Sequence, residues 1–252
     1  KLFTAALSLA TLGANYRIPT RLLAGDRVAH GQLHGPLILY GMGDPTLGTQ
    51  ASTDWADQLA SQAAAHGLHI VRGDLIADDS YFSGPSHGSG WEADDLQSWF
   101  AVPSSALSVQ ENVVDVSVTP ATGAGHPARF DFVPAEASPV LDGQLPTTAA
   151  HTPNDINLYR APGENILHVF GSIAARTPVQ HFKLAMTDPA RVAGPELRLA
   201  LARHGIRVTG QLKVVHWPQV DPALTDSIQL GEVLSPPVQE ILRRGLKRSQ
   251  NL

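Results

Sequence analysis

The composition of the chain changes abruptly near its middle, and this change limits the folds that the sequence can adopt. Residues 83–160 are dense in Gly, Pro, Ser and Thr, and their apolar residues occur in short alternating runs such as NVVDVSVTP and ARFDFVP. Short alternating runs between turn-forming residues predict a small β-rich unit with long loops. The flanking residues have longer apolar segments, so we expect this unit to be nested inside a different one.

The segments on either side of this stretch predict a mixed α+β architecture. TDWADQLASQAAAHGL and DPARVAGPELRLALARHGI have apolar residues at helical spacing and end with a glycine suited to a helix C-terminus. In both segments the helix is followed by a glycine, a strand, a second glycine and a second strand. This common order indicates similar supersecondary structure in one sheet rather than a true repeat. The strands expected here are YRIPTRLLAG and GQLHGPLILYG as an antiparallel pair, HIVRGDLIADDSYF as a strand pair bent at a glycine, GENILHVFGSIA, QHFKLAMTDP and RVTGQLKVVHW.

Two further helices are predicted at the ends of the chain. Residues 2–12 keep a helical repeat before Gly13, and residues 238–246 follow a Pro-Pro turn with an apolar stripe that we expect to be buried. Lys1 directly adjoins the first of these helical repeats, and no residue that could cap the helix precedes it. We therefore expect the chain to be a piece of a longer protein, with any signal peptide outside it. If residues 17–218 are inserted, both helices belong to one domain and the chain ends meet.

Composition and missing motifs exclude several classes of function. The net charge is −5 and the 18 Lys and Arg residues are scattered, so no basic stripe for nucleic acid is present. No apolar run reaches the roughly 18 residues of a membrane span. The chain has no Cys, and its 11 His include no H-E-x-x-H motif, so we expect no metal and no cofactor. GMGDPTL lacks a Walker lysine and predicts a tight turn after a strand.

The chain ends on LKRSQNL, in which Ser249 and Asn251 are the outer residues of an S-x-N tripeptide. Taken alone, such residues cap helices, and Lys1 alone is a solvated charge. Five motifs nevertheless occur in a defined order: KLFTAALSLATLGANYRIPTRL, GMGDPTL, GDLIADDSYF, GW-x-x-DDL followed by VPSSALSV-x-x-N, and LKRSQNL. Over all 252 residues this order resembles that of the class C low-molecular-mass penicillin-binding proteins, which are D-alanyl-D-alanine carboxypeptidases that also act as endopeptidases.

The resemblance implies a multidomain fold with nested insertions. Residues 1–16 and 219–252 would be parts of the penicillin-binding, serine β-lactamase-like transpeptidase domain. Residues 17–82 and 161–218 would form an inserted sheet-plus-helix domain, and residues 83–160 a small β-rich domain nested within it.

The resemblance also implies catalytic roles for residues at both chain ends. Lys1 matches the lysine of S-x-x-K and is the candidate base, although the base is disputed in this enzyme class. Ser249 would pass the proton towards the leaving D-alanine amine, and Asn251 would bind the substrate peptide and help to fix the lysine. The nucleophilic serine would lie three residues before Lys1, and K-T-G would follow Leu252. The middle residue of S-x-N is Gln250, where the fuller motif has Asp.

A second site is implied in GWEADDLQSWFAVPSSAL. Among relatives an acid here binds the free amine of meso-diaminopimelate beside an aromatic residue, and the matching positions are Asp95 and Phe100. Asp94 is the rival to Asp95, and the alternative for the pair is a charge at a helix N-terminus. The implied partners are peptidoglycan stem peptides of the diaminopimelate type and β-lactam antibiotics, in a periplasmic or extracytoplasmic location. Peripheral membrane association and a homo-oligomer stay open.

Three functions are compatible with these residues. The first is a serine D-Ala-D-Ala carboxypeptidase or endopeptidase that acts through an acyl-enzyme and is inhibited by β-lactams. The second is a non-catalytic relative that binds peptidoglycan or serves as a scaffold, because residues 17–218 exceed what hydrolysis requires. The third is a β-lactamase or esterase with the same S-x-x-K chemistry, which the large insertion disfavours.

Overall fold

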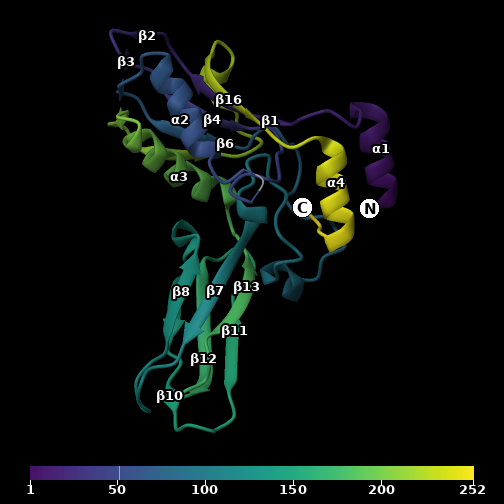
Figure 1. Cartoon of the computed structure of the whole chain (residues 1–252), viewed down its shortest axis with the longest axis vertical. Coiled ribbons are helices and arrows are strands. Elements are labelled where there is room, and N and C mark those ends of the chain that lie inside the picture. The colour runs from purple at the N-terminus through teal and green to yellow at the C-terminus, as the bar shows by residue number, and fades with distance from the viewer. Residues whose placement is uncertain (51) are drawn as a thin grey trace. The chain divides into compact units, whose positions relative to one another are not determined.

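The chain forms two units in a computed structural model that describes residues 1–50 and 52–252 (Figure 1). Helices and several sheets occur together, so the mixed α+β class is confirmed. The division into three domains stays a prediction. The first unit contains Lys1–Ser86, Ser104–Asn112 and Asp188–Leu252, and the second contains His87–Pro103 and Val113–Thr187.

A five-stranded mixed sheet forms the centre of the first unit. β1 and β4 pair antiparallel, as the sequence predicts, and β16 pairs antiparallel with the other edge of β1. β4, β6 and β15 run parallel, so their carboxyl ends share one edge, where α/β sheets commonly hold functional side chains. In spatial order the strands are β15 (Leu212–Val215), β6 (Leu75–Asp78), β4 (Leu37–Gly41), β1 (Pro19–Ala24) and β16 (Ile228–Leu234).

Three of these strands continue from a smaller sheet through closely stacked glycines. A Cβ on Gly210 would lie 2.2 Å from the carbonyl oxygen of Gly73, and a Cβ on Gly73 would lie 2.3 Å from that of Gly35, so no larger residue fits either crossing. The segment after each of the two predicted helices contributes its first strand to the smaller sheet and its second strand to the five-stranded sheet. The prediction that these strands lie in one sheet is therefore wrong. The prediction that the two strands of HIVRGDLIADDSYF pair with each other is also wrong. The smaller sheet contains β14 (Arg207–Val208), β5 (Ile70–Val71), β3 (Gln32–Leu33) and β2 (Val28–Ala29).

Two amphipathic helices pack against the five-stranded sheet and against each other. The predicted apolar face of the first is buried at Trp55, Leu59 and Ala63, and that of the second at Leu197 and Leu201. Burying one large apolar side chain stabilises the folded state by about 1.5–3 kcal/mol, so these apolar faces stabilise the packing of both helices against the sheet. The helical elements of this part are α2 (Trp55–Ala65), α3 (Pro189–Arg203), and the 3₁₀ turns η2 (Gln110–Asn112) and η4 (Pro222–Leu224).

The helices at the two chain ends, α1 (Leu2–Leu12) and α4 (Val238–Arg248), lie side by side (Figure 1). Ala5 and Val238 are the buried side chains of these two helices. Of the stripe predicted along α4, Val238 is buried, Ile241 and Leu242 are half-buried and Leu246 is 39% exposed, so the stripe is buried only in part. The reason is that α4 packs mainly against α1, which is itself largely exposed in the described part of the chain.

The second unit is built from strands whose inner faces form a β core. Val114, Val116 and Val118 alternate inward along β7, and Leu167 and Val169 do so along β12. GENILHVFGSIA and QHFKLAMTDP form β12 and β13. β12 pairs with β9 and β11, and β13 pairs with β7, so both strands belong to this unit and not to the sheets of the first one. The elements are β7 (Val113–Thr119), β8 (Arg129–Val133), β9 (Val140–Gly143), β10 (Thr147–Thr148), β11 (Asp155–Tyr159), β12 (Ile166–Ala174), β13 (Gln180–Ala185), η1 (Ala93–Gln97) and η3 (Ala135–Ala137).

Candidate active site

Lys1 and Ser249 meet although 248 positions separate them in the chain. Lys1 Nζ donates to Ser249 Oγ at 3.0 Å and also to the backbone oxygen of Ser249. Lys1 is the N-cap residue of α1, and Ser249 is the C-cap residue of α4 in a left-handed conformation, with φ at 55°. The side-by-side packing of the two terminal helices therefore brings an amine and a hydroxyl within range for proton transfer.

A pocket opens beside this pair in the first unit. Asn251 lines it together with Lys1, so the structure brings all three predicted catalytic residues to one place. Apolar side chains of α4, including Ile241 and Leu242, also line it. The pocket thus combines a few polar groups with apolar walls, the usual composition of a small-ligand site.

Pro45 also lines this pocket, a contact that its sequence motif did not indicate. It belongs to GMGDPTL, which forms the tight turn that the sequence predicts after β4. Asp44 holds the turn, since its Oδ1 accepts from Thr46 N at 2.8 Å and from Thr46 Oγ1 at 2.7 Å. Burial raises the pKa of the Asp44 carboxyl above its usual range. Gly43 has a φ of 99°, and its missing side chain leaves room for the ring of Phe82.

Asp95 and Phe100 lie in the second unit, close to each other in sequence. Asp95 is the N3 residue of a capping box in η1, where its Oδ2 accepts from Glu92 N at 3.3 Å. Phe100 contacts Trp91 and Trp99, with ring centroids 6.1 and 6.0 Å apart respectively. The segment therefore contains acidic residues in one 3₁₀ turn and a group of three aromatic rings that follows and precedes this turn in sequence. Its substrate role, and the choice between Asp94 and Asp95, stay predictions.

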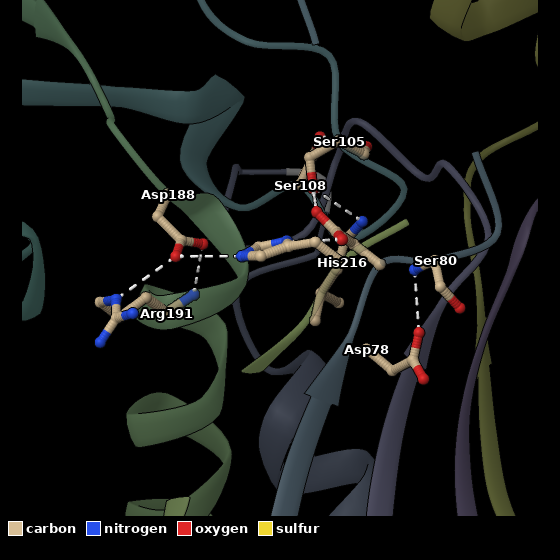
Figure 2. Close-up of polar contacts among 9 residues, drawn as sticks. Asp78, Ser80, Ser105, Ser108, Asp188, Arg191 and His216 are labelled. Carbon is tan, nitrogen blue, oxygen red and sulfur yellow. Dashed lines mark hydrogen bonds and ion pairs between the residues drawn. The ribbon is translucent and has the colours of Figure 1, made fainter. Parts of the chain in front are cut away.

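A polar cluster that the sequence did not indicate lies at the carboxyl ends of β6 and β15 (Figure 2). His216 Nδ1 contacts Asp79 Oδ1 at 2.8 Å, and His216 Nε2 contacts Asp188 Oδ2 at 3.3 Å. Burial lowers the pKa of His216, but the hydrogen bonds and charges of Asp79 and Asp188 outweigh it and raise this pKa above its usual value. The ring thus joins the end of β15 to the end of β6 and to the N-terminus of α3, which Asp188 caps.

Neither a metal site nor a membrane-spanning helix is found among the described residues. Across residues 1–50 and 52–252, no three side chains of the types that bind metals are grouped to hold an ion. Within the same residues, every helix is too short or too polar to cross a bilayer.

Comparison with known sequences gives one family and several related enzymes. The model of the D-Ala-D-Ala carboxypeptidase 3 (S13) family matches residues 1–252. A D-alanyl-D-alanine carboxypeptidase from Actinomadura sp. (strain R39) is 34% identical over 249 residues, covering 94% of this chain and 45% of the relative. D-alanyl-D-alanine carboxypeptidase DacB from Haemophilus influenzae is 25% identical over 255 residues, covering 100% and 50%. The chain spans about half the length of these curated relatives.

Solved structures resemble the chain over nearly its whole length. Penicillin binding protein 4 (dacB) from Haemophilus influenzae superposes with a TM-score of 0.82 at 24% identity, covering 99% of this chain and 53% of that one. A structure of the same protein complexed with a novel β-lactam gives 0.72 at 21% identity, covering 99% and 51%. At these identities the likeness supports a common fold.

Proposed function

Because the chain belongs to the D-Ala-D-Ala carboxypeptidase 3 (S13) family, we propose that the protein containing it is a serine-type D-Ala-D-Ala carboxypeptidase and endopeptidase of peptidoglycan stem peptides. The observation that carries the proposal is the 3.0 Å hydrogen bond from Lys1 Nζ to Ser249 Oγ. An amine and a hydroxyl at this distance form the proton-transfer pair that an acylating serine enzyme requires.

Catalysis would proceed through an acyl-enzyme formed on a serine three residues before Lys1. This serine would attack the carbonyl carbon of the penultimate D-alanine, and Lys1 would accept its proton. Ser249 would relay that proton to the nitrogen of the leaving D-alanine as the peptide bond breaks, and Asn251 would hydrogen-bond the substrate peptide. Water would then hydrolyse the ester. A β-lactam carbonyl would acylate the same serine, so these drugs would inhibit the enzyme.

The second unit would read the side chain of the substrate. The carboxylate of Asp95 would pair with the free amine of diaminopimelate, and Phe100 would offer an aromatic face to the same cation. Support comes from the grouping of Phe100 with Trp91 and Trp99, which flank the acidic turn in sequence. A substrate in the cell wall implies an extracytoplasmic protein.

The experiment that tests the proposal uses the protein with the residues that precede Lys1 and follow Leu252. It is incubated with a fluorescent penicillin and, separately, with a stem peptide ending in D-Ala-D-Ala. We expect a covalent label that survives denaturation, and release of free D-alanine. A protein that neither takes the label nor releases D-alanine is not the proposed enzyme.

A further inference from the structure

Three consecutive residues, Gln110, Glu111 and Asn112, adopt a left-handed backbone conformation. Their φ angles are 49°, 57° and 56°, whereas the other non-glycine residues described with a positive φ do not adjoin one another. This conformation is strained for residues with a side chain, and such strain persists only where surrounding contacts enforce it. Strained backbone also concentrates at functional sites.

The two outer residues of the turn are held by the interior of the first unit. Gln110 N donates to Leu47 O at 2.7 Å, and the Gln110 side chain donates to Glu196 Oε1 at 3.1 Å. Asn112 is completely buried, and its Oδ1 accepts from Val109 N at 3.1 Å. These contacts fix both ends of the turn, so the backbone at the middle residue and the direction of its Cα–Cβ bond are fixed as well.

The segment that leads into the turn is anchored to the carboxyl edge of the sheet. Asn112 Nδ2 donates to Ser108 Oγ at 3.0 Å, and Ser108 Oγ donates to Ser105 O at 2.9 Å. Ser105 Oγ in turn donates to Asp79 Oδ2 at 2.8 Å, and Asp79 also contacts His216. Figure 2 shows Ser105, Ser108 and His216 as members of this chain of contacts. The left-handed turn is therefore connected to the carboxyl edge of the five-stranded sheet.

The middle residue, Glu111, connects this anchored turn to helix α4. Glu111 Oε1 contacts Arg244 Nη2 at 3.2 Å and Arg248 Nη1 at 3.4 Å. The two arginines are four residues apart and so lie on the same face of α4, across its last turn. The side chains of Glu111 and Arg244 are each 27% exposed, so this pair is less screened by solvent than a surface pair.

The end of α4 carries Ser249, and little apolar burial holds it there. Val238, in the first turn, is the helix's one buried side chain, whereas Arg248 immediately precedes Ser249 in the last turn. We propose that Glu111 is a positioning residue of the reaction: it holds the last turn of α4 so that Ser249 Oγ stays within hydrogen-bond reach of Lys1 Nζ. This inference rests on the proposed function, because the pair it positions is the proposed proton relay.

The test compares acylation by a β-lactam in the parent protein, Glu111→Gln and Glu240→Gln. Glu240 also lies on α4 and is exposed, but in its first turn, so its variant is a control for charge loss on the same helix. A misplacement of about 1 Å costs about a hundredfold in rate. We expect Glu111→Gln to move Ser249 Oγ by less than this, and therefore to lower the acylation rate constant about tenfold. The dissociation constant of the initial complex should change less than twofold. Glu111→Asp, which keeps the charge, should recover part of the rate.

The outcomes separate the inference from the proposed function. If the parent protein is acylated and Glu111→Gln is acylated at the same rate, the positioning role is wrong and the function stands. If the parent protein is not acylated at all, the function fails and the inference with it. If Glu111→Gln does not fold, Arg248→Gln replaces it. The Arg248 side chain is 61% exposed, and its substitution removes one partner of Glu111. An unchanged rate in a folded Arg248→Gln variant would then overturn the positioning role, and a reduced rate would support it.

Discussion

The stacked glycines that join the two sheets of the first unit predict a specific loss of stability in Gly210→Ala. The added methyl group would lie 2.2 Å from the oxygen and 2.5 Å from the carbon of the Gly73 carbonyl, whereas real Cβ contacts stay above 3.0 Å. Both obstacles are backbone atoms, so the crossing must move by roughly 1 Å. We expect this movement to weaken two hydrogen bonds of Gln211: Leu75 N donates to Gln211 O at 2.9 Å, and Gln211 N donates to Asp74 Oδ1 at 2.8 Å.

We expect Gly210→Ala to lower the free energy of unfolding by about 2–3 kcal/mol. Overpacking contributes about 1–3 kcal/mol, and a weakened buried hydrogen bond adds about 1 kcal/mol. The lower entropy of the unfolded alanine variant offsets about 0.4–1 kcal/mol of this loss. Urea unfolding followed by circular dichroism measures the change as a lower midpoint with an unchanged slope.

Gly88→Ala is the matched control, because a Cβ there meets nothing within 4 Å and the residue has no positive φ. We expect its free energy of unfolding to stay within about 0.5 kcal/mol of the parent value. Gly73→Ala should reproduce the loss, since its Cβ would lie 2.3 Å from the oxygen of Gly35. Equal stabilities of the Gly210→Ala and Gly88→Ala variants would show that the crossings are not closely packed.

Lys1→Ala should slow acylation by penicillin about 10²–10⁴-fold, because it removes the proposed proton acceptor, and a normal rate in stopped-flow would eliminate Lys1 as the base. Asp95→Asn should raise KM about tenfold for a stem peptide with a free diaminopimelate amine but not for its acetylated form; equal effects would contradict the substrate role. Burial lowers the pKa of His216, but Asp79 and Asp188 raise it above 6.5 overall. The parent should therefore exceed His216→Asn in stability, by less than about 1 kcal/mol, below pH 6.5, and lose this margin as pH rises through the raised pKa. A margin that grows with pH would refute this.

Local signals in the sequence predict the helices and most strands, because their causes lie within a few residues. The apolar face of α2 and its end near Gly67 follow from helical spacing and from the left-handed conformation that glycine adopts, here with a φ of 77°. Sheet membership is different, since it depends on pairing between distant segments. HIVRGDLIADDSYF contains two strands, as predicted, but each pairs with a strand more than 100 residues later and in a different sheet.

The candidate site divides in the same way. The proximity of Lys1 and Ser249 could be predicted, because the order of the motifs placed both in one domain. His216 could not, since nothing in LKVVHW indicates that the residue after β15 lies beside Asp79. Glu111 was equally hidden, because its partners are on α4 and its backbone conformation is one that side-chain-bearing residues seldom adopt.

The contact between Lys1 and Ser249 depends on directional polar interactions more than on burial. α1 and α4 bury one side chain each among the described residues, Ala5 and Val238, which leaves the last turn of α4 without an apolar anchor. Its orientation must then come from the ion pairs of Glu111 and from the hydrogen bonds that Lys1 donates. Salt screens partly exposed ion pairs but hardly affects a packed core. The geometry of the Lys1–Ser249 pair should therefore respond to ionic strength under conditions in which the five-stranded sheet does not.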